Sequence, residues 1–253
     1  MSDREFDMVI GIHSIIAALE NSDRRTIKLV CTEDARDEIK KKVRLDKVEV
    51  QLCASHKVQE EAKMVFRDLD LEYHRVPSGA YLLTSAMTIF NVAQLYEKIE
   101  NSEKLKILCL DQISDVHNAA AILRTASFYG VDLVIVPDKK SFGLTPSFFR
   151  IASGAAEFVP MYGVSKLTKT LTKMKEMGIL CLGLSEHAKG DLDVSAVAEN
   201  PNGACLVLGR EDVGISNAVL RVLDHHISLD SNGDIKSLNV STAAAISMEK
   251  CFS

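Results

Sequence analysis

A charged side chain that could hold an anion lies in the segment DQISDVHNAAAILRT, residues 111–125, directly after the apolar run 106–110. Asn118 stands at the entrance of an expected helix, and Arg124 lies two turns inside it. Guanidinium is a permanent, fork-shaped cation that suits phosphate, so Arg124 is a candidate anion clamp. A surface or salt-bridged position on a helix explains the same residue, and this segment alone leaves both interpretations open.

A glycine-flanked acid follows the apolar run 204–208. The segment GREDVGIS, residues 209–216, places Glu211 between Gly209 and Gly214, as in a turn that cradles a ligand. It is not a Walker phosphate loop, because Ile215 follows Gly214 where a lysine is required, and the chain contains no GxGxxG dinucleotide motif. Nucleotide hydrolysis and hydride transfer are therefore disfavoured. Glu211 also fits a cap for the helix expected from about Ser216.

Small polar residues crowd a third helix entrance, after the apolar run that ends at Leu229. The segment DSNGDIKSLNVSTAAAI, residues 230–246, contains Ser237, Asn239 and Ser241. Helix capping accounts for one or two of these side chains, not for all three. The alanines at 243–245 permit the close approach of another helix or of backbone.

The elements that position these segments alternate regularly along the chain. Apolar periodicity predicts strands at 27–31, 48–52, 106–110, 133–136, 158–161, 179–184, 204–208 and 226–229, and helices at 34–44, 56–69, 91–99, 118–129, 148–152, 166–177, 216–223 and 238–250. We expect a small α/β domain over 5–76, a linker over 77–90 that contains Pro77, Ser78 and Gly79, and a second domain over 91–253. Because the strands of the second domain read as continuous apolar runs, they predict a parallel sheet covered by helices on both faces. Ligands of such sheets lie beyond the carboxyl ends of the strands, where the three polar segments begin.

Composition narrows the class of protein. The 253 residues carry a formal net charge of −5. They contain no uninterrupted apolar stretch of about 18 residues and show no secretory or transit signal, so we expect a cytoplasmic protein. The cysteines lack metal-ligand spacing and predict buried, reduced thiols and no metal. These residues are Cys31, Cys53, Cys109, Cys181, Cys205 and Cys251.

Two basic segments could contact a polyanion despite the negative net charge. The first comprises Lys40, Lys41, Lys42, Arg44 and Lys47, and the second comprises Lys166, Lys169, Lys173 and Lys175. Acidic residues lie close to the first, and an apolar series runs through the second. Ordinary solvated surfaces therefore explain both, and a nucleic-acid contact stays open at either.

Three motifs together resemble those of a known family. They are DxxxDxxNxxAIxRTAxxxG at 111–130, LxxGxExxGxS at 206–216 and SLNVSxAAAI at 237–246. In this order and spacing they resemble the SpoU/TrmH family of RNA ribose 2′-O-methyltransferases, within the SPOUT superfamily. IASGAAEFVP at 151–160 and MVIGIHSIIAALE at 8–20 extend the likeness to nearly the whole chain. Within this family, the chain most resembles the TrmH-like rRNA (guanosine-2′-O-)-methyltransferases.

The resemblance implies a fold, a reaction and partners. It implies a C-terminal trefoil knot that forms the cofactor pocket, preceded by a small substrate-binding domain. The reaction is transfer of a methyl group from S-adenosylmethionine to a ribose 2′-hydroxyl of structured RNA, with rRNA favoured over tRNA. A homodimer with its active sites at the interface is implied as well, and no metal is needed.

The family motifs carry over to particular residues of this sequence. The expected catalytic residues are Asn118, Arg124, Glu211, Ser237 and Asn239. The expected cofactor-binding residues are Gly209, Leu229 and Leu238, with Leu184 and Ser185 at the preceding strand end.

A hypothesis for the roles of these residues follows from their chemistry. Because arginine practically never loses its proton, we interpret Arg124 as an electrostatic clamp on the RNA phosphate and not as a general base. Asn118 and Asn239 would orient the ribose and the arginine, Glu211 would fix the guanidinium, and Ser237 would bind the nucleotide or the loop.

The sequence also departs from the family pattern. Val116 and Ala120 stand where proline and glycine are expected, and Leu229, Asp230 and Ser231 replace the usual Ile-Pro-Met. An acid beside the cofactor loop leaves open how tightly the cofactor binds. Two alternatives therefore remain: an RNA-binding relative without methyl transfer, and an unrelated α/β enzyme.

Overall fold

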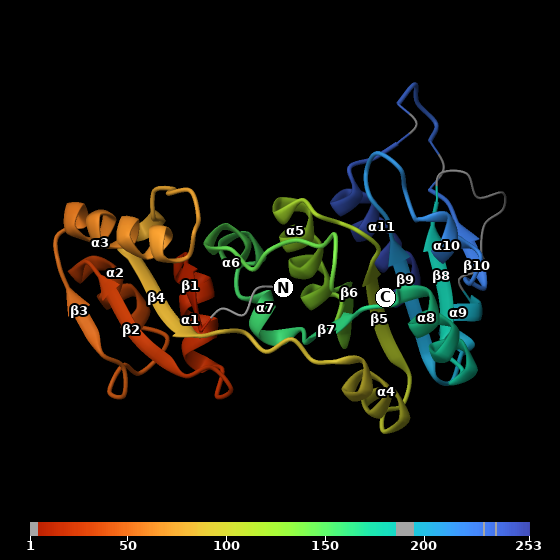
Figure 1. Cartoon of the computed structure of the whole chain (residues 1–253), viewed down its shortest axis with the longest axis horizontal. Helices are drawn as coiled ribbons and strands as arrows, with labels where there is room; N and C mark the ends of the chain where they lie inside the picture. The colour runs from red at the N-terminus through yellow and green to blue at the C-terminus, as the bar shows by residue number, and fades with distance from the viewer. Residues whose placement is uncertain (1–4, 186–194, 230, 236) are drawn as a thin grey trace. The chain divides into compact units, whose positions relative to one another are not determined.

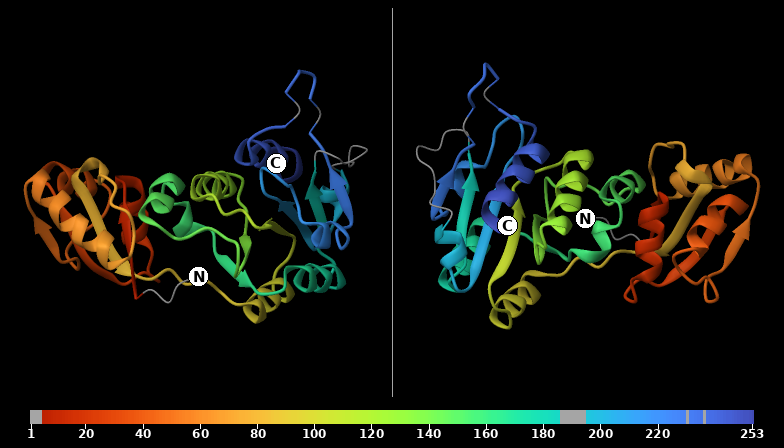
Figure 2. Two further views of the ribbon diagram at one scale, coloured as in Figure 1. Left: turned by 45° about the horizontal axis from the view of Figure 1, so that its top comes forward. Right: turned by 180° about the vertical axis from the view of Figure 1, so that it is seen from behind.

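The chain folds into two units, each built around its own sheet. The structure, a computed structural model, describes residues 5–185, 195–229, 231–235 and 237–253. The first unit extends to Thr88 and also contains Leu144–Phe158, whereas the second comprises Ile89–Gly143 and Val159–Ser253. In Figures 1 and 2 the first sheet is coloured red to yellow, and the second runs from olive through green to blue. The sequence prediction placed the segment 144–158 in the second domain, but its contacts belong to the first unit.

The first unit contains a four-stranded mixed sheet. Its elements are β1 (Phe6–Ile10), α1 (Ile12–Glu20), β2 (Thr26–Cys31), α2 (Glu33–Lys40), β3 (Val50–Leu52), α3 (Ser55–Asp68), the 3₁₀ turn η1 (Pro77–Gly79), β4 (Ala80–Ser85), α6 (Pro146–Ala152) and α7 (Ala155–Phe158). The strand order is β1-β4-β2-β3, with β4 antiparallel to both of its neighbours and β2 parallel to β3. Helix α3 buries Val58, Ala62 and Phe66 against this sheet, because residues spaced by four lie on one helix face.

The prediction of a linker over 77–90 is wrong for most of that segment. Residues 80–85 form β4, which lies between β1 and β2 and buries Ala80, Tyr81 and Leu82. The residues Pro77–Gly79 that suggested a linker form the tight turn η1, in which Ser78 has a positive φ of 58°. Turn-forming residues mark the start of a central strand here.

Buried charges attach α7 to the first sheet. Arg24 Nη1 lies 2.9 Å from Asp7 Oδ2 of β1, and Arg24 Nε lies 3.5 Å from Glu157 Oε2 of α7. These three side chains are at most 3% exposed. Asn21 also donates a hydrogen bond of 2.8 Å to Glu157 Oε2. Because Glu157 is remote in sequence from its partners, this network explains why the segment 144–158 belongs to the first unit.

The second unit contains a six-stranded parallel sheet. Its elements are α4 (Val92–Glu100), β5 (Leu105–Leu110), α5 (Val116–Phe128), β6 (Leu133–Pro137), β7 (Met161–Val164), α8 (Leu167–Glu176), β8 (Leu180–Leu184), α9 (Ser195–Glu199), β9 (Gly203–Leu208), α10 (Asn217–Leu220), β10 (His225–Ile227) and α11 (Val240–Phe252). The strand order is β10-β8-β9-β5-β6-β7, and every pairing is parallel. The predicted strand at 158–161 is misplaced, because residues 155–158 form helix α7 and β7 begins only at Met161.

Helices cover both faces of this sheet, as the sequence predicted. Alternate residues of β5 point to opposite faces, and Ile107 packs with side chains of α4, α8 and α10. On the other face, α11 contacts α5, α9 and β9, and α9 also contacts β9. The second unit is therefore an α/β structure of three layers around a parallel sheet.

Two further predictions from the sequence can be compared with the fold. All six cysteines are free thiols; five are buried, as predicted, whereas Cys53 is only half-buried. Within the residues described above, no helix combines the length and the apolar character that crossing a membrane requires.

Candidate active site

The three polar segments meet at the carboxyl edge of the second sheet. Strands β5 and β9 are neighbours and end in register at Leu110 and Leu208, so the segments that follow them start side by side. The third segment enters α11, which packs on α5. The order of the strands thus brings together residues that are separated by more than a hundred positions.

Two asparagines and one glutamate form a hydrogen-bonded cluster at this edge. Asn118 Nδ2 donates 2.8 Å to Glu211 Oε1, and Asn239 Nδ2 donates 2.6 Å to the same oxygen. Asn239 Nδ2 also lies 3.0 Å from Asn118 Oδ1. Each of the three polar segments contributes one member. We call Asn118, Glu211 and Asn239 the amide–carboxylate cluster.

Helix capping orients the two asparagines. Asp115 is the N-cap of α5 and accepts the backbone N–H of Asn118 at 2.8 Å, which fixes Asn118 in the first turn. Asn239 is itself the N-cap of α11, and its Oδ1 accepts from Ser241 N at 2.9 Å. The side-chain oxygen of Asn239 therefore caps the helix while its nitrogen serves the cluster.

A closed turn presents Glu211. The backbone groups of Arg210 and Gly214 bond to each other in both directions, at 3.1 and 2.9 Å. Asp111, which is 3% exposed, accepts the backbone N–H of Ser216 at 2.8 Å and so fixes the end of the turn to β5. The sequence analysis offered Glu211 as a cap for the helix that begins near Ser216. Asp111 makes that contact instead, and the Glu211 carboxylate bonds to the two asparagines.

The exposed charges of this turn are paired. Arg210 Nε donates 2.9 Å to Asp212 Oδ1, and the second guanidinium nitrogen contacts the other carboxylate oxygen. Hydrogen bonding from Arg210 lowers the pKa of Asp212 below its ordinary value. Because Asp212 is paired with Arg210, Glu211 is the carboxylate of this turn that bonds to the asparagine side chains.

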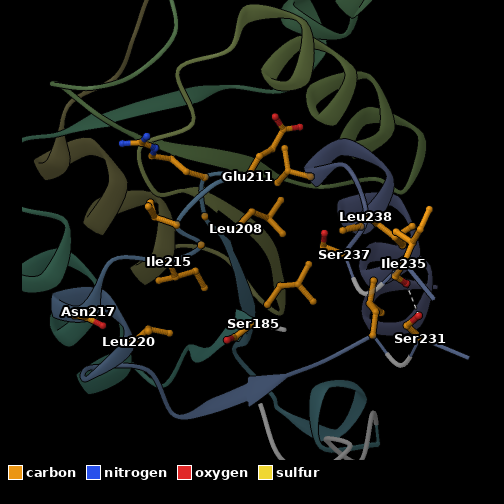
Figure 3. Close-up of a pocket in the computed structure, with 18 residues that line it drawn as sticks. Ser185, Leu208, Glu211, Ile215, Asn217, Leu220, Ser231, Ile235, Ser237 and Leu238 are labelled. Carbon is orange, nitrogen blue, oxygen red and sulfur yellow. Dashed lines mark hydrogen bonds between the residues drawn. The ribbon is translucent and has the colours of Figure 1, made fainter. Parts of the chain in front are cut away.

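A cavity of about 580 Å³ opens beside the cluster. Figure 3 shows Leu208, Ile215 and Leu220 on one side of it, facing Ile235, Ser237 and Leu238 on the other. The five predicted cofactor-binding residues all lie on its wall. These are Leu184, Ser185, Gly209, Leu229 and Leu238.

A smaller cavity of about 200 Å³ is also lined by Glu211. Asp115, Asn118 and Asp212 line it, whereas Arg210 and Glu211 line both cavities. Within the cluster, Glu211 therefore borders both the larger, mainly apolar cavity and the smaller, polar one, and Asn118 borders the smaller one.

The structure also shows lining residues that the sequence analysis missed. Ile215 precedes α10, Leu220 is the last residue of α10, and Ile235 comes from the segment before α11. Residues 215, 219 and 223 are apolar and share a helical spacing, a pattern that indicates core packing as readily as a ligand site. Asp230 lies outside the described residues, so the structure does not bear on its effect.

Arg124 is not joined to the cluster within this chain. It is exposed on α5, and its six-residue separation from Asn118 rotates its direction by about 240° around the helix. Its side chain lines neither cavity. In the described part of the chain no ion pair links it to Glu211, so the predicted role of Glu211 in fixing the Arg124 guanidinium is not found here. The carboxylate is instead satisfied by Asn118 and Asn239.

Comparisons with known proteins agree with this arrangement. The family model described as SpoU rRNA Methylase family matches residues 106–249, which cover all three polar segments. The 23S rRNA (guanosine-2′-O-)-methyltransferase RlmB of Pseudomonas aeruginosa is 30% identical over 246 residues, covering 96% of this chain and 94% of that protein. Its counterpart in Neisseria meningitidis serogroup B is 31% identical over 242 residues, covering 94% and 91%.

A solved structure has a similar fold over most of the chain. The SpoU methyltransferase AviRb from Streptomyces viridochromogenes, in complex with AdoMet, superposes with a TM-score of 0.73 at 20% identity, covering 97% of this chain and 88% of that one. The family model matches more than half of the chain, and the two relatives align over more than 90% of their length. The chain therefore belongs to the SpoU rRNA methylase family, and its fold agrees with that assignment.

Proposed function

We propose that this chain transfers a methyl group from S-adenosylmethionine to a ribose 2′-hydroxyl of structured RNA. The observation that carries the proposal is the amide–carboxylate cluster, whose member Glu211 borders both cavities. Asn118, Glu211 and Asn239 come from three separate segments and converge on one oxygen atom. A cluster so placed can hold a sugar beside a methyl donor that is bound in the larger cavity.

The larger cavity suits S-adenosylmethionine. Its volume of about 580 Å³ lies within the ordinary range for small-molecule sites. Leucine and isoleucine side chains provide an apolar wall for the adenine ring, and the Glu211 carboxylate at its edge can attract a positively charged group. Gly209 lets the backbone approach closely, since a Cβ there would meet Gly214 C at 2.2 Å.

Bound S-adenosylmethionine supplies an activated methyl group on a positively charged sulfur. The task left to the protein is to align the ribose oxygen and to stabilise it as it becomes anionic, while the hydroxyl proton passes to a phosphate oxygen or to water. Asn118 and Asn239 orient the sugar through amide groups that Glu211 holds in place. Ser237, on the wall of the larger cavity, binds the nucleotide or fixes the neighbouring loop.

Arg124 acts from a second copy of the chain. Its guanidinium lines neither cavity of its own chain, although its type suits a phosphate beside the reacting hydroxyl. Phe128 on the same helix is 82% exposed, and Ile246 on the adjoining α11 is 38% exposed. A homodimer that covers these apolar side chains would bring Arg124 to the partner's site, where it serves as an electrostatic clamp.

The named relatives support ribosomal RNA as the substrate class. RlmB of Pseudomonas aeruginosa and of Neisseria meningitidis are both named as 23S rRNA (guanosine-2′-O-)-methyltransferases, and each aligns over more than 90% of its length. We therefore favour rRNA over tRNA. A C-terminal trefoil knot and a cytoplasmic location belong to the same proposal and stay predictions.

Methylation mapping tests the proposal directly. Ribose methylation is mapped across rRNA and tRNA from cells with and without this protein, and purified protein is then added back to the unmodified RNA with S-adenosylmethionine. We expect one ribose to lose its methyl group in the deletion and to regain it in vitro. Unchanged methylation in both experiments contradicts the proposal. RNA binding without any methyl transfer would favour the alternative of a binding protein that lacks catalysis.

A further inference from the structure

The two basic segments of the sequence differ in how far their charges are already neutralised. In α8, Lys173 Nζ lies 3.4 Å from Glu176 Oε2, and Lys175 Nζ lies 2.9 Å from Asp224 Oδ1. Lys175 also donates 2.8 Å to the carbonyl oxygen of Val222. Half of the cations of this segment therefore serve contacts within the protein.

The segment 40–47 keeps its cations unpaired. Its five basic side chains are all exposed, and the described residues offer none of them an ion pair. Among the acids of α2, Asp37 is paired with Arg36, and the described residues show no ion pair between Glu38 and the segment. Asp46 is the one acid inside the segment, so five cations stand against one carboxylate. The five are Lys40, Lys41, Lys42, Arg44 and Lys47.

Helix stabilisation does not explain this concentration of charge. Cations at a helix carboxyl end interact favourably with the helix dipole, but the effect is confined to the last turn. Lys40 lies in the last turn of α2 and Lys41 is its C-cap. Lys42, Arg44 and Lys47 lie beyond the helix, where that benefit has ended.

The segment beyond the helix is folded and anchored. Lys42 N and Val43 N both donate to the carbonyl oxygen of Ile39, at 2.9 and 3.1 Å, and Val48 N donates 3.0 Å to Leu45 O. Leu45 is 7% exposed and holds the turn to the core. A turn fixed in this way presents its cations with little backbone entropy left to lose on binding.

We propose that residues 40–47 form a surface that binds the phosphate backbone of the RNA substrate, separate from the catalytic site. We call it the 40–47 surface. It contains no aromatic side chain to stack on bases, so it supplies affinity and not sequence recognition. The inference rests on the proposed function for the identity of the polyanion. It gives a protein of net charge −5 a local site for RNA.

Matched charge removal tests the 40–47 surface. The full-length variant Lys41→Gln/Lys42→Gln/Arg44→Gln is compared with the control Lys166→Gln/Lys169→Gln/Lys173→Gln, which loses the same charge from α8. Binding to a fluorescent, structured 23S rRNA fragment is followed by anisotropy over a series of KCl concentrations. Because each lost phosphate contact lowers the salt slope by about 0.7–0.9, the surface variant should lose about 2 in slope and bind at least about tenfold more weakly near 0.1 M salt. The α8 control should remain near the wild type.

Charge-preserving substitution and cofactor binding separate the possible outcomes. Lys41→Arg/Lys42→Arg/Arg44→Lys should restore RNA binding, and all variants should bind S-adenosylmethionine as the wild type does in calorimetry. Wild-type RNA affinity and salt slope in the glutamine variant overturn the proposal, as does an equal loss in the α8 control. If the wild type binds RNA through this surface but transfers no methyl group, the proposed function fails and the surface stands. If methyl transfer occurs and the surface variant binds RNA normally, the surface alone fails.

Discussion

Asn118 and Glu211, which are 93 residues apart in the sequence, are joined by a hydrogen bond of 2.8 Å from Nδ2 to Oε1. Asn239 donates to the same carboxylate oxygen at 2.6 Å. One acceptor thus holds two amide groups from different helix entrances, and its loss would release both. This bond and the one from Ser216 N to Asp111 both link the loops that follow β5 and β9.

Replacing Glu211 should therefore impair catalysis more than cofactor binding. Glu211→Ala removes the shared acceptor, and we expect kcat to fall by about 10²-fold, as for the loss of a preorganised group at a reacting centre. Glu211→Gln keeps an acceptor oxygen without the charge and should retain more activity. Single-turnover methyl transfer measures both variants, with calorimetry for S-adenosylmethionine. Wild-type kcat in the alanine variant would remove the cluster from the mechanism.

Arg124 offers a separate test, because its side chain is exposed and makes no ion pair within the described residues. We expect Arg124→Lys to abolish turnover, since an ammonium group cannot reproduce the forked contact of guanidinium with phosphate. S-adenosylmethionine affinity should stay near that of the wild type, because Arg124 lines neither cavity. Arg221→Lys, at an exposed position after α10, is the matched control. Substantial turnover by the Arg124 variant would refute the clamp.

Mixing two inactive variants tests whether Arg124 acts on the partner's site. If it does, a heterodimer of the Arg124→Lys and Glu211→Ala chains contains one site with both wild-type residues. Equal mixing after reversible dissociation should then restore about a quarter of the wild-type activity, because half of the dimers are mixed and half of their sites are complete. Activity that stays at the level of the separate variants would place Arg124 in its own chain's site or outside catalysis.

Much of the candidate site could be predicted from the sequence because the second unit obeys simple rules. Buried parallel strands read as continuous apolar runs, and polar residues placed directly after such runs gather at one edge of the sheet. Asn118 and Glu211 follow adjacent strands, and Asn239 caps a helix that packs on α5. Their proximity follows from the order of the strands, and the family resemblance had grouped the three as catalytic residues without giving that order.

Other features depend on contacts that no local pattern reveals. Strand β4 was mistaken for a linker, because turn residues precede it and its period is irregular. Glu157 joins the first unit through Arg24, a partner more than a hundred residues away. The bonding of Glu211 to two asparagines and not to Arg124 depends on side-chain directions around α5, which motif spacing does not specify.

The closed turn at Gly209 predicts a strict steric limit. A Cβ at this position would lie 2.2 Å from Gly214 C and from Ile215 N, both backbone atoms that cannot move aside independently. Overpacking of this kind costs about 1–3 kcal/mol. If the turn must regain its strained form to bind S-adenosylmethionine, Gly209→Ala should weaken binding by about 5- to 140-fold. Gly233→Ala is the control, since a Cβ there meets nothing within 4 Å. If calorimetry gives equal S-adenosylmethionine affinities for the two variants, the steric limit at position 209 is contradicted.

The buried carboxyl of Glu157 predicts a pH dependence of stability. Burial raises its pKa above the ordinary value, the nearby Asp7 adds to that effect, and Arg24 and Asn21 oppose it. Its Oε1 atom has no hydrogen-bond partner among the described residues. The folded state therefore binds a proton more tightly than the unfolded chain does. The stabilising contribution of this group is complete below the unfolded pKa and is lost as the pH rises through the raised folded pKa.

Glu157→Gln isolates this contribution, because glutamine has the same shape and does not titrate. Urea unfolding of the wild type and of the variant at pH 5 and pH 7 gives the difference in their free energies of unfolding at each pH. We expect that difference to favour the wild type more at pH 5 than at pH 7, since the protonated carboxyl no longer bears the cost of a buried charge. The opposite trend would mean that attraction to Arg24 outweighs burial, in which case the ionised carboxylate stabilises the attachment of α7 to the first sheet.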